Sequence, residues 1–200
     1  GLLMQAFDSL SRNIQQYIYD KGWPSLTRIQ NAAIKQVANT DHNLILSAPT
    51  ASGKTEAAFI PALNSVEDWD TGLKVLYISP LKALINDQFQ RISELSAYLD
   101  IPITPWHGEV SQAQKKKVVN QPKGILLITP ESIEGMLVNR PGKAQHLFKG
   151  VEWIIIDELH SFLGTERGVH LQSLLQRISQ FMQAPRFIAM SATLNKKDFG

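Results

Sequence analysis

Apolar and polar positions divide this chain into short apolar runs and longer amphipathic stretches. Six apolar runs read NLILS, KVLYIS, PITPW, GILLIT, EWIIID and RFIAMS. Helical spacing of apolar residues predicts helices over 8–21, 25–38, 55–65, 81–97, 111–119, 131–138 and 168–183. Strands that do not alternate, and that are separated by helices, are typical of a parallel sheet covered on both faces. The pattern therefore predicts an α/β fold, in which 66–72 and 139–146 are expected to be surface loops.

Polar residues follow five of these runs, at the point where each expected strand ends. The sequences there are SAPT, SPLK, TPES, DELH and SAT. Because ligands of open α/β sheets bind beyond the carboxyl ends of the strands, the five exits predict one extended active edge. Ser, Thr or Asp helix caps at the strand-to-helix junctions would explain part of the pattern. They do not explain Lys54 or the adjacent acids Asp157 and Glu158.

Length and composition limit the classes of protein to which the chain can belong. The chain has 200 residues, of which 44% are hydrophobic, enough for one domain with a substantial core or at most two small ones. Its formal net charge of +2 is too small to argue for nucleic-acid binding by itself. The lack of cysteine excludes a disulfide framework and a thiolate zinc site.

The ends of the chain and its apolar runs bear on location. No apolar run approaches the roughly 20 residues that span a bilayer, so no membrane association is expected. The lack of cysteine fits an intracellular, cytoplasmic protein. The chain begins with Gly1 in place of Met and stops at NKKDFG without an obvious ending. We therefore expect a fragment of a longer protein.

The segment LILSAPTASGKTEAAFI, residues 44–60, places a loop of small residues between an apolar run and a helical pattern. The loop matches the phosphate-loop pattern G-x-x-x-x-G-K-[ST] except that Ala48 replaces the first Gly. Backbone N–H groups and the helix N-terminus would bind phosphate there. Lys54 would reach the β- and γ-phosphates, and the Thr55 hydroxyl would be a ligand of Mg²⁺. The alternative is an ordinary helix that begins with Gly-Lys-Thr.

The segment WIIIDELH ends a strongly apolar run in two acids. Burying two acids at a strand end is costly unless they meet a cation or water. Asp157 is placed to hold Mg²⁺ through water, and Glu158 is placed to orient and deprotonate an attacking water. An exposed acidic helix cap is the alternative. Combined with the phosphate loop, the acids predict a site that hydrolyses a nucleoside triphosphate with Mg²⁺.

These segments follow the order of a known set of motifs. WPSLTRIQ (23–30), with Phe7 upstream, resembles the Q motif; APTASGKT resembles motif I, where Ala is usual at the first position; SPLKALINDQ (79–88), TPES (129–132), DELH (157–160) and SAT (191–193) resemble motifs Ia, Ib, II and III. Over nearly its whole length the chain resembles the first RecA-like domain of superfamily 2 helicases, the DEAD/DEAH-box relatives. HGEVSQ (107–112), TPESIEGML (129–137) and GTERGVHLQSLLQRI (164–178) are similar to the Lhr-type (long helicase-related) helicases. Arg28 departs from the Q motif, which usually has Pro or a small residue there.

The resemblance implies a fold and an activity. The fold would be a RecA-like P-loop fold, with a mostly parallel central sheet in a three-layer αβα arrangement. Helices within residues 1–40 would carry the Q motif as part of the same domain, and residues 41–200 would form the ATP-binding RecA-like domain. The activity would be that of an ATP-dependent helicase or translocase that binds Mg-ATP and single-stranded DNA or RNA. A second RecA-like domain outside this chain would supply an arginine finger, so we expect the chain alone to bind nucleotide but hydrolyse it very slowly.

The resemblance also implies roles for individual residues. Gln30 would hydrogen-bond the adenine, and the nucleotide would further contact Ala48, Pro49, Thr50, Ala51, Ser52, Gly53, Lys54 and Thr55. Lys54, Asp157 and Glu158 would be catalytic, with Thr55 and Asp157 at the metal. Nucleic acid would contact Ser79, Pro80, Lys82, Thr129, Pro130, Glu131, Ser132, Arg167 and Gly168. His160, Ser191 and Thr193 would couple the ATP site to the nucleic-acid face, although capping could explain these three and a surface salt bridge could explain Arg167.

Some alternatives stay open at this point. Lys115, Lys116 and Lys117 suggest a basic patch, but three adjacent lysines point around a helix rather than along one face, which favours a solvated surface. Trp106 and His107 either stack on a base or pack at a strand end. The chain could also be a superfamily 2 ATPase that remodels protein–nucleic-acid complexes without strand separation, a nucleotide-gated binding module without turnover, or a small-molecule P-loop kinase.

Overall fold

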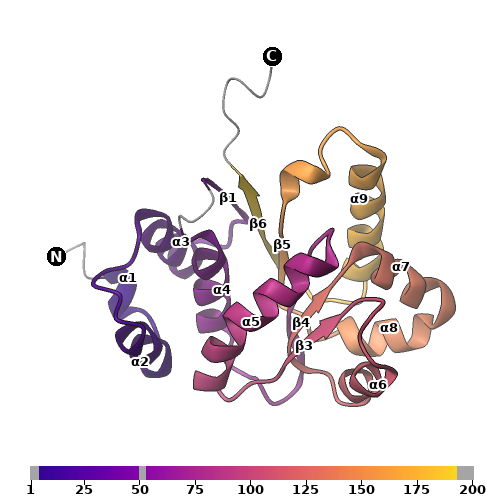
Figure 1. The fold of residues 1–200 in the computed structure, drawn as a ribbon, viewed down its shortest axis with the longest axis horizontal. Coiled ribbons are helices and arrows are strands. Elements are labelled where there is room, and N and C mark those ends of the chain that lie inside the picture. Colours follow the sequence, from indigo (N-terminus) through magenta and orange to yellow (C-terminus); the bar gives the residue numbers. More distant parts are fainter. Residues whose placement is uncertain (1–4, 50–52, 193–200) are drawn as a thin grey trace.

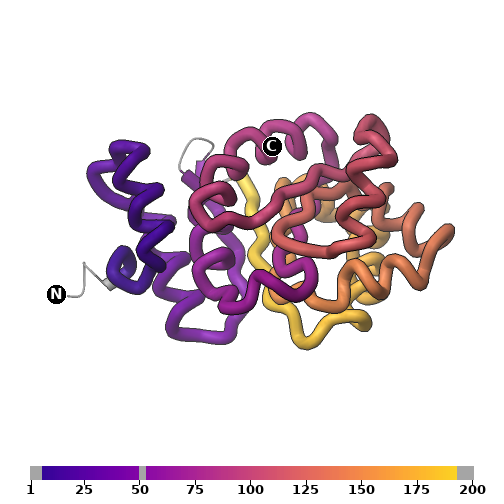
Figure 2. The backbone as a smooth tube through the Cα atoms, turned by 90° about the horizontal axis from the view of Figure 1, so that it is seen from below, coloured from indigo at the N-terminus to yellow at the C-terminus, as the bar shows by residue number. Residues whose placement is uncertain are grey.

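Three helices precede the sheet and pack against its core. The structure is a computed structural model that describes residues 5–49 and 53–192. Helices α1 (Gln5–Asp8), α2 (Arg12–Asp20) and α3 (Arg28–Asn39) lie at one end of the molecule, drawn in indigo in Figure 2. The helix expected over 8–21 is two helices, because the Ser11 hydroxyl accepts a hydrogen bond from the Ile14 N–H and caps a new helix. Buried Ile14 and Tyr17 join the core that also contains the sheet residues.

The described strands form one parallel sheet of six, as the apolar runs predict. The strands are β1 (Leu44–Ala48), β2 (Gly72–Ile78), β3 (Ile103–Trp106), β4 (Lys123–Ile128), β5 (Trp153–Ile156) and β6 (Arg186–Ala192). Their order across the sheet is β1-β6-β5-β2-β4-β3, and every pairing is parallel. All carboxyl ends of the strands therefore lie at one edge (Figure 1).

Successive strand residues face two separate hydrophobic cores, which makes the fold three-layered. On β2, Tyr77 packs into the core shared with α3, α4 (Lys54–Ser65) and α5 (Lys82–Tyr98). Its neighbour Leu76 packs into the core shared with α6 (Gln112–Asn120), α7 (Pro130–Asn139) and α9 (Glu166–Ser179). The helix–sheet–helix arrangement confirms the expected αβα fold (Figure 1).

One expected loop is a helix. Residues 139–146 were expected to lie in a surface loop, but α8 (Pro141–Phe148) begins two residues into that stretch. Pro141 stands at the first helical position, where its missing N–H costs nothing. Leu147 and Phe148 then bury completely against the second core, which the polar start of the segment does not indicate.

The strand order places the five polar strand exits side by side at the carboxyl edge of the sheet. Their order across the sheet differs from their order along the chain. From β1 across to β4, the exits are SAPT, SAT, DELH, SPLK and TPES, on five neighbouring strands. The phosphate-loop and acidic segments thus lie on one side of the edge and the SPLK and TPES segments on the other. Within residues 5–49 and 53–192, no helix has the length and apolar character that crossing a membrane requires.

Candidate nucleotide and nucleic-acid site

The junction between the loop and α4 is held by Gln30. The Gln30 amide Nε2 donates to the Gly53 carbonyl oxygen at 3.3 Å, and its Oε1 accepts from the Thr27 N–H at 3.0 Å. Gly53 has φ of +81°, and a Cβ there would lie 2.6 Å from Gln30 Nε2. Gly53 is therefore required by its backbone conformation, and the Gln30 amide would have to shift to admit a Cβ there. Ala48 and Pro49 lead into this loop, whereas Thr50, Ala51 and Ser52 lie outside the described residues.

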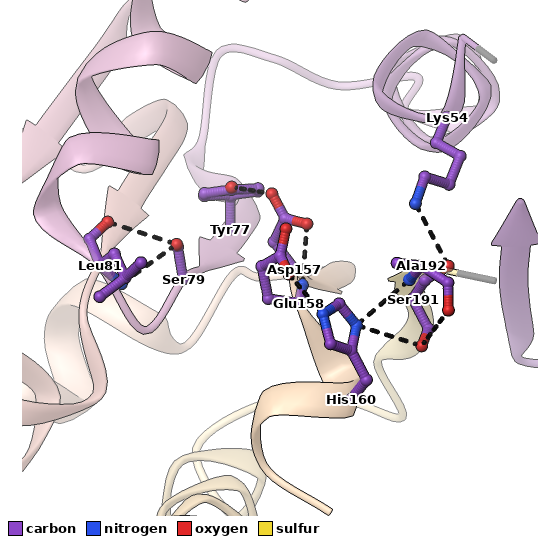
Figure 3. Close-up of polar contacts among 9 residues, drawn as sticks. All are labelled: Lys54, Tyr77, Ser79, Leu81, Asp157, Glu158, His160, Ser191 and Ala192. Atoms are coloured by element: carbon purple, nitrogen blue, oxygen red, sulfur yellow. Dashed lines mark hydrogen bonds and ion pairs between the residues drawn. The ribbon is translucent and has the colours of Figure 1, made fainter. Parts of the chain in front are cut away.

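Lys54 is the first residue of α4 and reaches across to β6. Its Nζ donates to the Ser191 carbonyl oxygen at 3.2 Å, as Figure 3 shows. The amine thus lies at the carboxyl edge of the sheet, where the helix N-terminus adds its partial positive charge. This is the geometry in which a phosphate would meet both the ammonium group and the first backbone N–H groups of α4.

The Thr55 hydroxyl is buried and held by two residues of α5. Its Oγ1 accepts from Gln88 Nε2 at 3.3 Å and from Arg91 Nη1 at 3.5 Å. Arg91 also pairs through Nε with Glu56 at 3.6 Å. Gln88 Oε1 is buried and finds no hydrogen-bond partner among the described residues. Sequence reasoning assigned no role to Gln88 or Arg91, although Gln88 is the last residue of the SPLKALINDQ segment.

Asp157 is fixed by a tyrosine that sequence reasoning missed. The Tyr77 hydroxyl donates to Asp157 Oδ2, and the Glu158 N–H donates to Oδ1 at 2.8 Å (Figure 3). Burial, and then the charge of Asp157, raise the pKa of Tyr77 well above its usual range, so the phenol remains a donor. Asp157 is 8% exposed. A Tyr within an apolar run is easily read as core, and only the pairing of β2 with β5 shows that its hydroxyl meets the acid.

Glu158 adopts a backbone conformation that non-glycine residues rarely take. Its φ and ψ are +54° and +43°, in the left-handed region. Its side chain contacts His160, whose Nε2 lies 2.7 Å from Glu158 Oε2. Such strain costs about 1–3 kcal/mol and is found mainly where surrounding contacts enforce it.

His160 joins Glu158 to the end of β6. Its Nδ1 accepts from the Ala192 N–H at 3.1 Å and lies 3.3 Å from the Ser191 hydroxyl. Because a backbone N–H can only donate, Nδ1 carries no proton, and in the neutral ring the proton is on Nε2, facing Glu158. A continuous chain of contacts therefore runs from Glu158 through His160 and Ser191 to Lys54 (Figure 3). Thr193 lies outside the described residues.

The residues expected to contact nucleic acid divide into buried and exposed groups. Ser79, Pro80, Thr129 and Pro130 are buried. The hydroxyl of Ser79 bonds to the Leu81 backbone, and that of Thr129 caps α7 by accepting from the Ser132 N–H at 3.2 Å. These four residues pack and cap the strand-to-helix junctions, and Pro80 and Thr129 also line a depression between the SPLK and TPES segments.

Three of the remaining members border this depression between the SPLK and TPES segments. It has a volume of about 430 Å³ and is lined in part by Lys82, Glu131 and Ser132. We call it the Ia/Ib depression. Lys82 pairs with Glu109 at 2.5 Å, and Arg167 donates to the Pro80 carbonyl oxygen at 3.1 Å. The Lys82–Glu109 pair is exposed and therefore weak, so an incoming phosphate competes with the Glu109 carboxylate at little cost.

Gly168 has a packing role. A Cβ at this position would lie 2.1 Å from the Phe162 carbonyl oxygen, and its N–H donates to the Thr165 hydroxyl that caps α9. The neighbouring Arg167 lies 3.7 Å from Glu131 and 5.6 Å from the centre of the Phe162 ring. Gly168 therefore positions Arg167 at the start of α9.

The structure places Trp106, His107 and the lysine run as follows. His107 is buried, with Nε2 3.0 Å from Asn86 Oδ1 and Nδ1 accepting from the Glu109 N–H, so it packs at the strand end. Trp106 is half-buried, and Lys115 Nζ lies 5.7 Å from the centre of its ring. The lysines diverge only in part: Lys117 lines one hollow, whereas Lys115 and Lys116 line another together.

Comparison with known proteins agrees with this geometry. Residues 27–199 match the DEAD/DEAH box helicase family. The chain is 30% identical to the ATP-dependent helicase Lhr-Core of Methanocaldococcus jannaschii, over 96% of this chain and 24% of that protein. It is 34% identical to the Lhr helicase/uracil glycosylase of Escherichia coli, over 84% of this chain and 12% of that protein. The chain thus spans about a quarter or less of the length of these relatives.

Two solved structures have the same fold. Mycobacterium smegmatis helicase Lhr, bound to ssDNA and AMP-PNP, superimposes with a TM-score of 0.82 at 27% identity, over 96% of this chain and 26% of that one. The DEAD-box helicase Mss116, bound to ssRNA and UDP-BeF, superimposes with a TM-score of 0.83 at 20% identity, over 98% of this chain and 41% of that one, which shows the fold alone.

Proposed function

Since the chain belongs to the DEAD/DEAH box helicase family, we propose that it is the ATP-binding motor domain of an intracellular ATP-dependent helicase or translocase. The observation that supports this most is the contact chain from Lys54 through Ser191 and His160 to Glu158. It links the Lys54 ammonium group, which would bind phosphate, to the Glu158 carboxylate, which would act as the base, through the end of β6. The N-terminal helices belong to the same domain in this proposal, which their packing against the core supports.

The proposal gives each residue of the contact chain a task. A bound triphosphate draws Lys54 from the Ser191 carbonyl oxygen, because a phosphate oxygen is the stronger acceptor for an ammonium group. Glu158 orients the attacking water and accepts its proton. The Nε2 proton of His160 faces Glu158, and its Nδ1 is held by the Ala192 N–H. His160 therefore transmits a change in the position of the Glu158 carboxylate to the end of β6. Gln30, whose amide contacts the Gly53 carbonyl oxygen in this structure, would select adenine.

Mg²⁺ fits the donor set. The described residues contain no group of three or more His, Cys, Asp or Glu side chains that would cage a metal. Mg²⁺ seldom uses such a cage and is more often held by one or two protein oxygens and the substrate phosphates. Thr55 and Asp157 would be those oxygens, with the Thr55 oxygen held in place by Gln88 Nε2. When bound, Mg²⁺ neutralises charge on the β- and γ-phosphates.

The nucleic-acid partner and the second domain complete the proposal. A single strand would lie along the Ia/Ib depression, with Lys82 and Ser132 at its phosphates. A second RecA-like domain would supply the cation that stabilises the transferring phosphate and would close on the strand as ATP binds. Remodelling of protein–nucleic-acid complexes without strand separation is the second candidate, because it uses the same site.

Nucleotide binding tests the site directly. We expect Lys54→Ala to weaken binding of a fluorescent ADP analogue by roughly 10- to 100-fold, since a charge-assisted hydrogen bond contributes about 1.5–3 kcal/mol. Lys149→Ala removes an equal charge from an exposed position on α8's end and should leave binding unchanged. Equal affinities for Lys54→Ala and wild type would refute the phosphate site.

Turnover separates a motor from a binding module. In the protein with its second domain, Glu158→Gln should retain nucleotide binding but lose most ATP hydrolysis stimulated by single-stranded nucleic acid. A rate equal to that of the wild type would favour a nucleotide-gated binding module.

A further inference from the structure

A second hollow lies beside the Ia/Ib depression, between α6, α7 and α8. We call it the basic hollow. It has a volume of about 280 Å³ and is lined by Lys115 and Lys116 of α6, by Arg140 and Lys143 at the start of α8, and by Trp106 at the end of β3. The three helices are neighbours at the β3 side of the sheet (Figure 1).

The charge of the basic hollow is positive and unpaired. No Asp or Glu lines it, and none of its four cations forms an ion pair within residues 5–49 and 53–192. Four like charges around one small hollow repel each other, which costs stability unless an anion is bound there. By contrast, Lys82 in the Ia/Ib depression is neutralised by Glu109.

The acids of α7 are turned away from the hollow. Glu134 pairs with Arg177 at 2.5 Å and lies 3.5 Å from His170, both on α9, and Glu131 faces Arg167, also on α9. The face of α7 that lines the hollow carries Ser132, Gly135, Met136 and Asn139, at helical spacing. One side of α7 therefore pairs with α9, and the other is left free of negative charge.

The two hollows share a residue. Ser132 lines both the Ia/Ib depression and the basic hollow. A chain that occupied the first could therefore continue into the second past Ser132, and Glu131, which lines the first, faces Arg167. The positive charge, the half-buried Trp106 and this continuity all fit a polyanion with aromatic groups.

We propose that the basic hollow binds the phosphodiester backbone of a single nucleic-acid strand as that strand leaves the Ia/Ib depression. This rests on the proposed function, since the strand must first lie in that depression. Lys115, Lys116, Arg140 and Lys143 contact phosphates without reading sequence. The hollow extends the length of strand that one domain holds, and its contribution to binding is strongly salt-dependent.

A salt series with a matched control measures this contribution. The triple variant Lys115→Gln, Lys116→Gln, Lys143→Gln is compared with Lys35→Gln, Lys117→Gln, Lys149→Gln, which removes the same charge outside the hollow. Binding of a labelled oligonucleotide is followed by fluorescence anisotropy. The slope of log K against log salt is negative. We expect the triple variant to reduce its magnitude by about 2, at roughly 0.7 per lost phosphate contact, and the control to reduce it much less.

Oligonucleotide length separates the two hollows. The shortest strand that wild type binds is compared with a strand several nucleotides longer. Wild type should bind the longer strand more tightly. The triple variant should bind the short strand normally but bind the longer strand no more tightly than the short one. Equal slopes for the triple variant and the control would overturn the proposal, as would an equal loss for short and long strands. Polyglutamate tests for an acidic protein as the ligand. If polyglutamate competes as well as nucleic acid does, and the triple variant loses this competition, the hollow binds an acidic protein and the proposal is overturned. Failure of wild type to bind any oligonucleotide would instead refute the proposed function itself.

Discussion

Removal of one hydroxyl, in Tyr77→Phe, tests whether Tyr77 holds Asp157. The substitution leaves the buried ring in place, with its stacking on Phe59 at 5.7 Å between ring centroids. What is lost is the donor to Asp157 Oδ2, while Oδ1 keeps the Glu158 N–H. The core should therefore stay packed, and the effect should come from a carboxylate oxygen that is buried without a partner.

The magnitude follows from the burial of the acid. A hydrogen bond to a charged group contributes about 1.5–3 kcal/mol, and the carboxylate is 8% exposed, so water replaces the hydroxyl poorly. In a domain of this size, 1 kcal/mol shifts the melting temperature by about 2–4 °C. We expect Tyr77→Phe to lower the free energy of unfolding by about 1.5–3 kcal/mol and the melting temperature by about 3–12 °C at neutral pH.

The chain offers a matched control and a stringent refutation. Tyr98 also donates to a carboxylate, Asp20 Oδ2 at 2.6 Å, but at an exposed position, so Tyr98→Phe should have a much smaller effect. A double-mutant cycle of Tyr77→Phe with Asp157→Ala, followed by urea unfolding, measures the coupling between the two side chains. A coupling free energy below about 0.5 kcal/mol would show that the hydroxyl does not hold the acid.

Three further predictions concern single residues. Burial raises the pKa of Tyr17 to about 12 from 10, so the protonated phenol favours the folded state. Roughly 1–3 kcal/mol of stability, reduced by solvent screening, is present below pH 10 and lost as pH rises through 12, and Tyr17→Phe should reduce that loss in unfolding titrations. Gly53→Ala should weaken ADP binding and lower the melting temperature, and Gln30→Ala should partly restore stability in the double variant, because the clash is with the Gln30 amide; no rescue would contradict this. Gly168→Ala meets backbone instead and should cost about 1–3 kcal/mol in thermal unfolding, whereas Gly142→Ala, which has open space around it, should be nearly neutral.

The fold and much of the site are readable from the sequence because each depends on local patterns. Runs such as WIII, repeated between helical patterns, are typical of strands buried on both faces, and a loop that ends in Gly-Lys-Thr between a strand and a helix commonly binds phosphate. The misses have local causes too. The helix at 141–148 begins with Pro-Gly, which is typical of a turn, and its apolar residues come only at its end.

The sequence by itself determined the parallel sheet, the edge at which chemistry would occur, and the amine and acids that would carry it, because strand and helix periodicity and short motifs are properties of neighbouring residues. Only the tertiary structure decided which distant side chains meet. Tyr77 and Asp157 are 80 positions apart, and Lys54 and Ser191 are 137 apart, so no local pattern records either contact. The strand order β1-β6-β5-β2-β4-β3 brings them together, and the pairing of whole strands fixes that order.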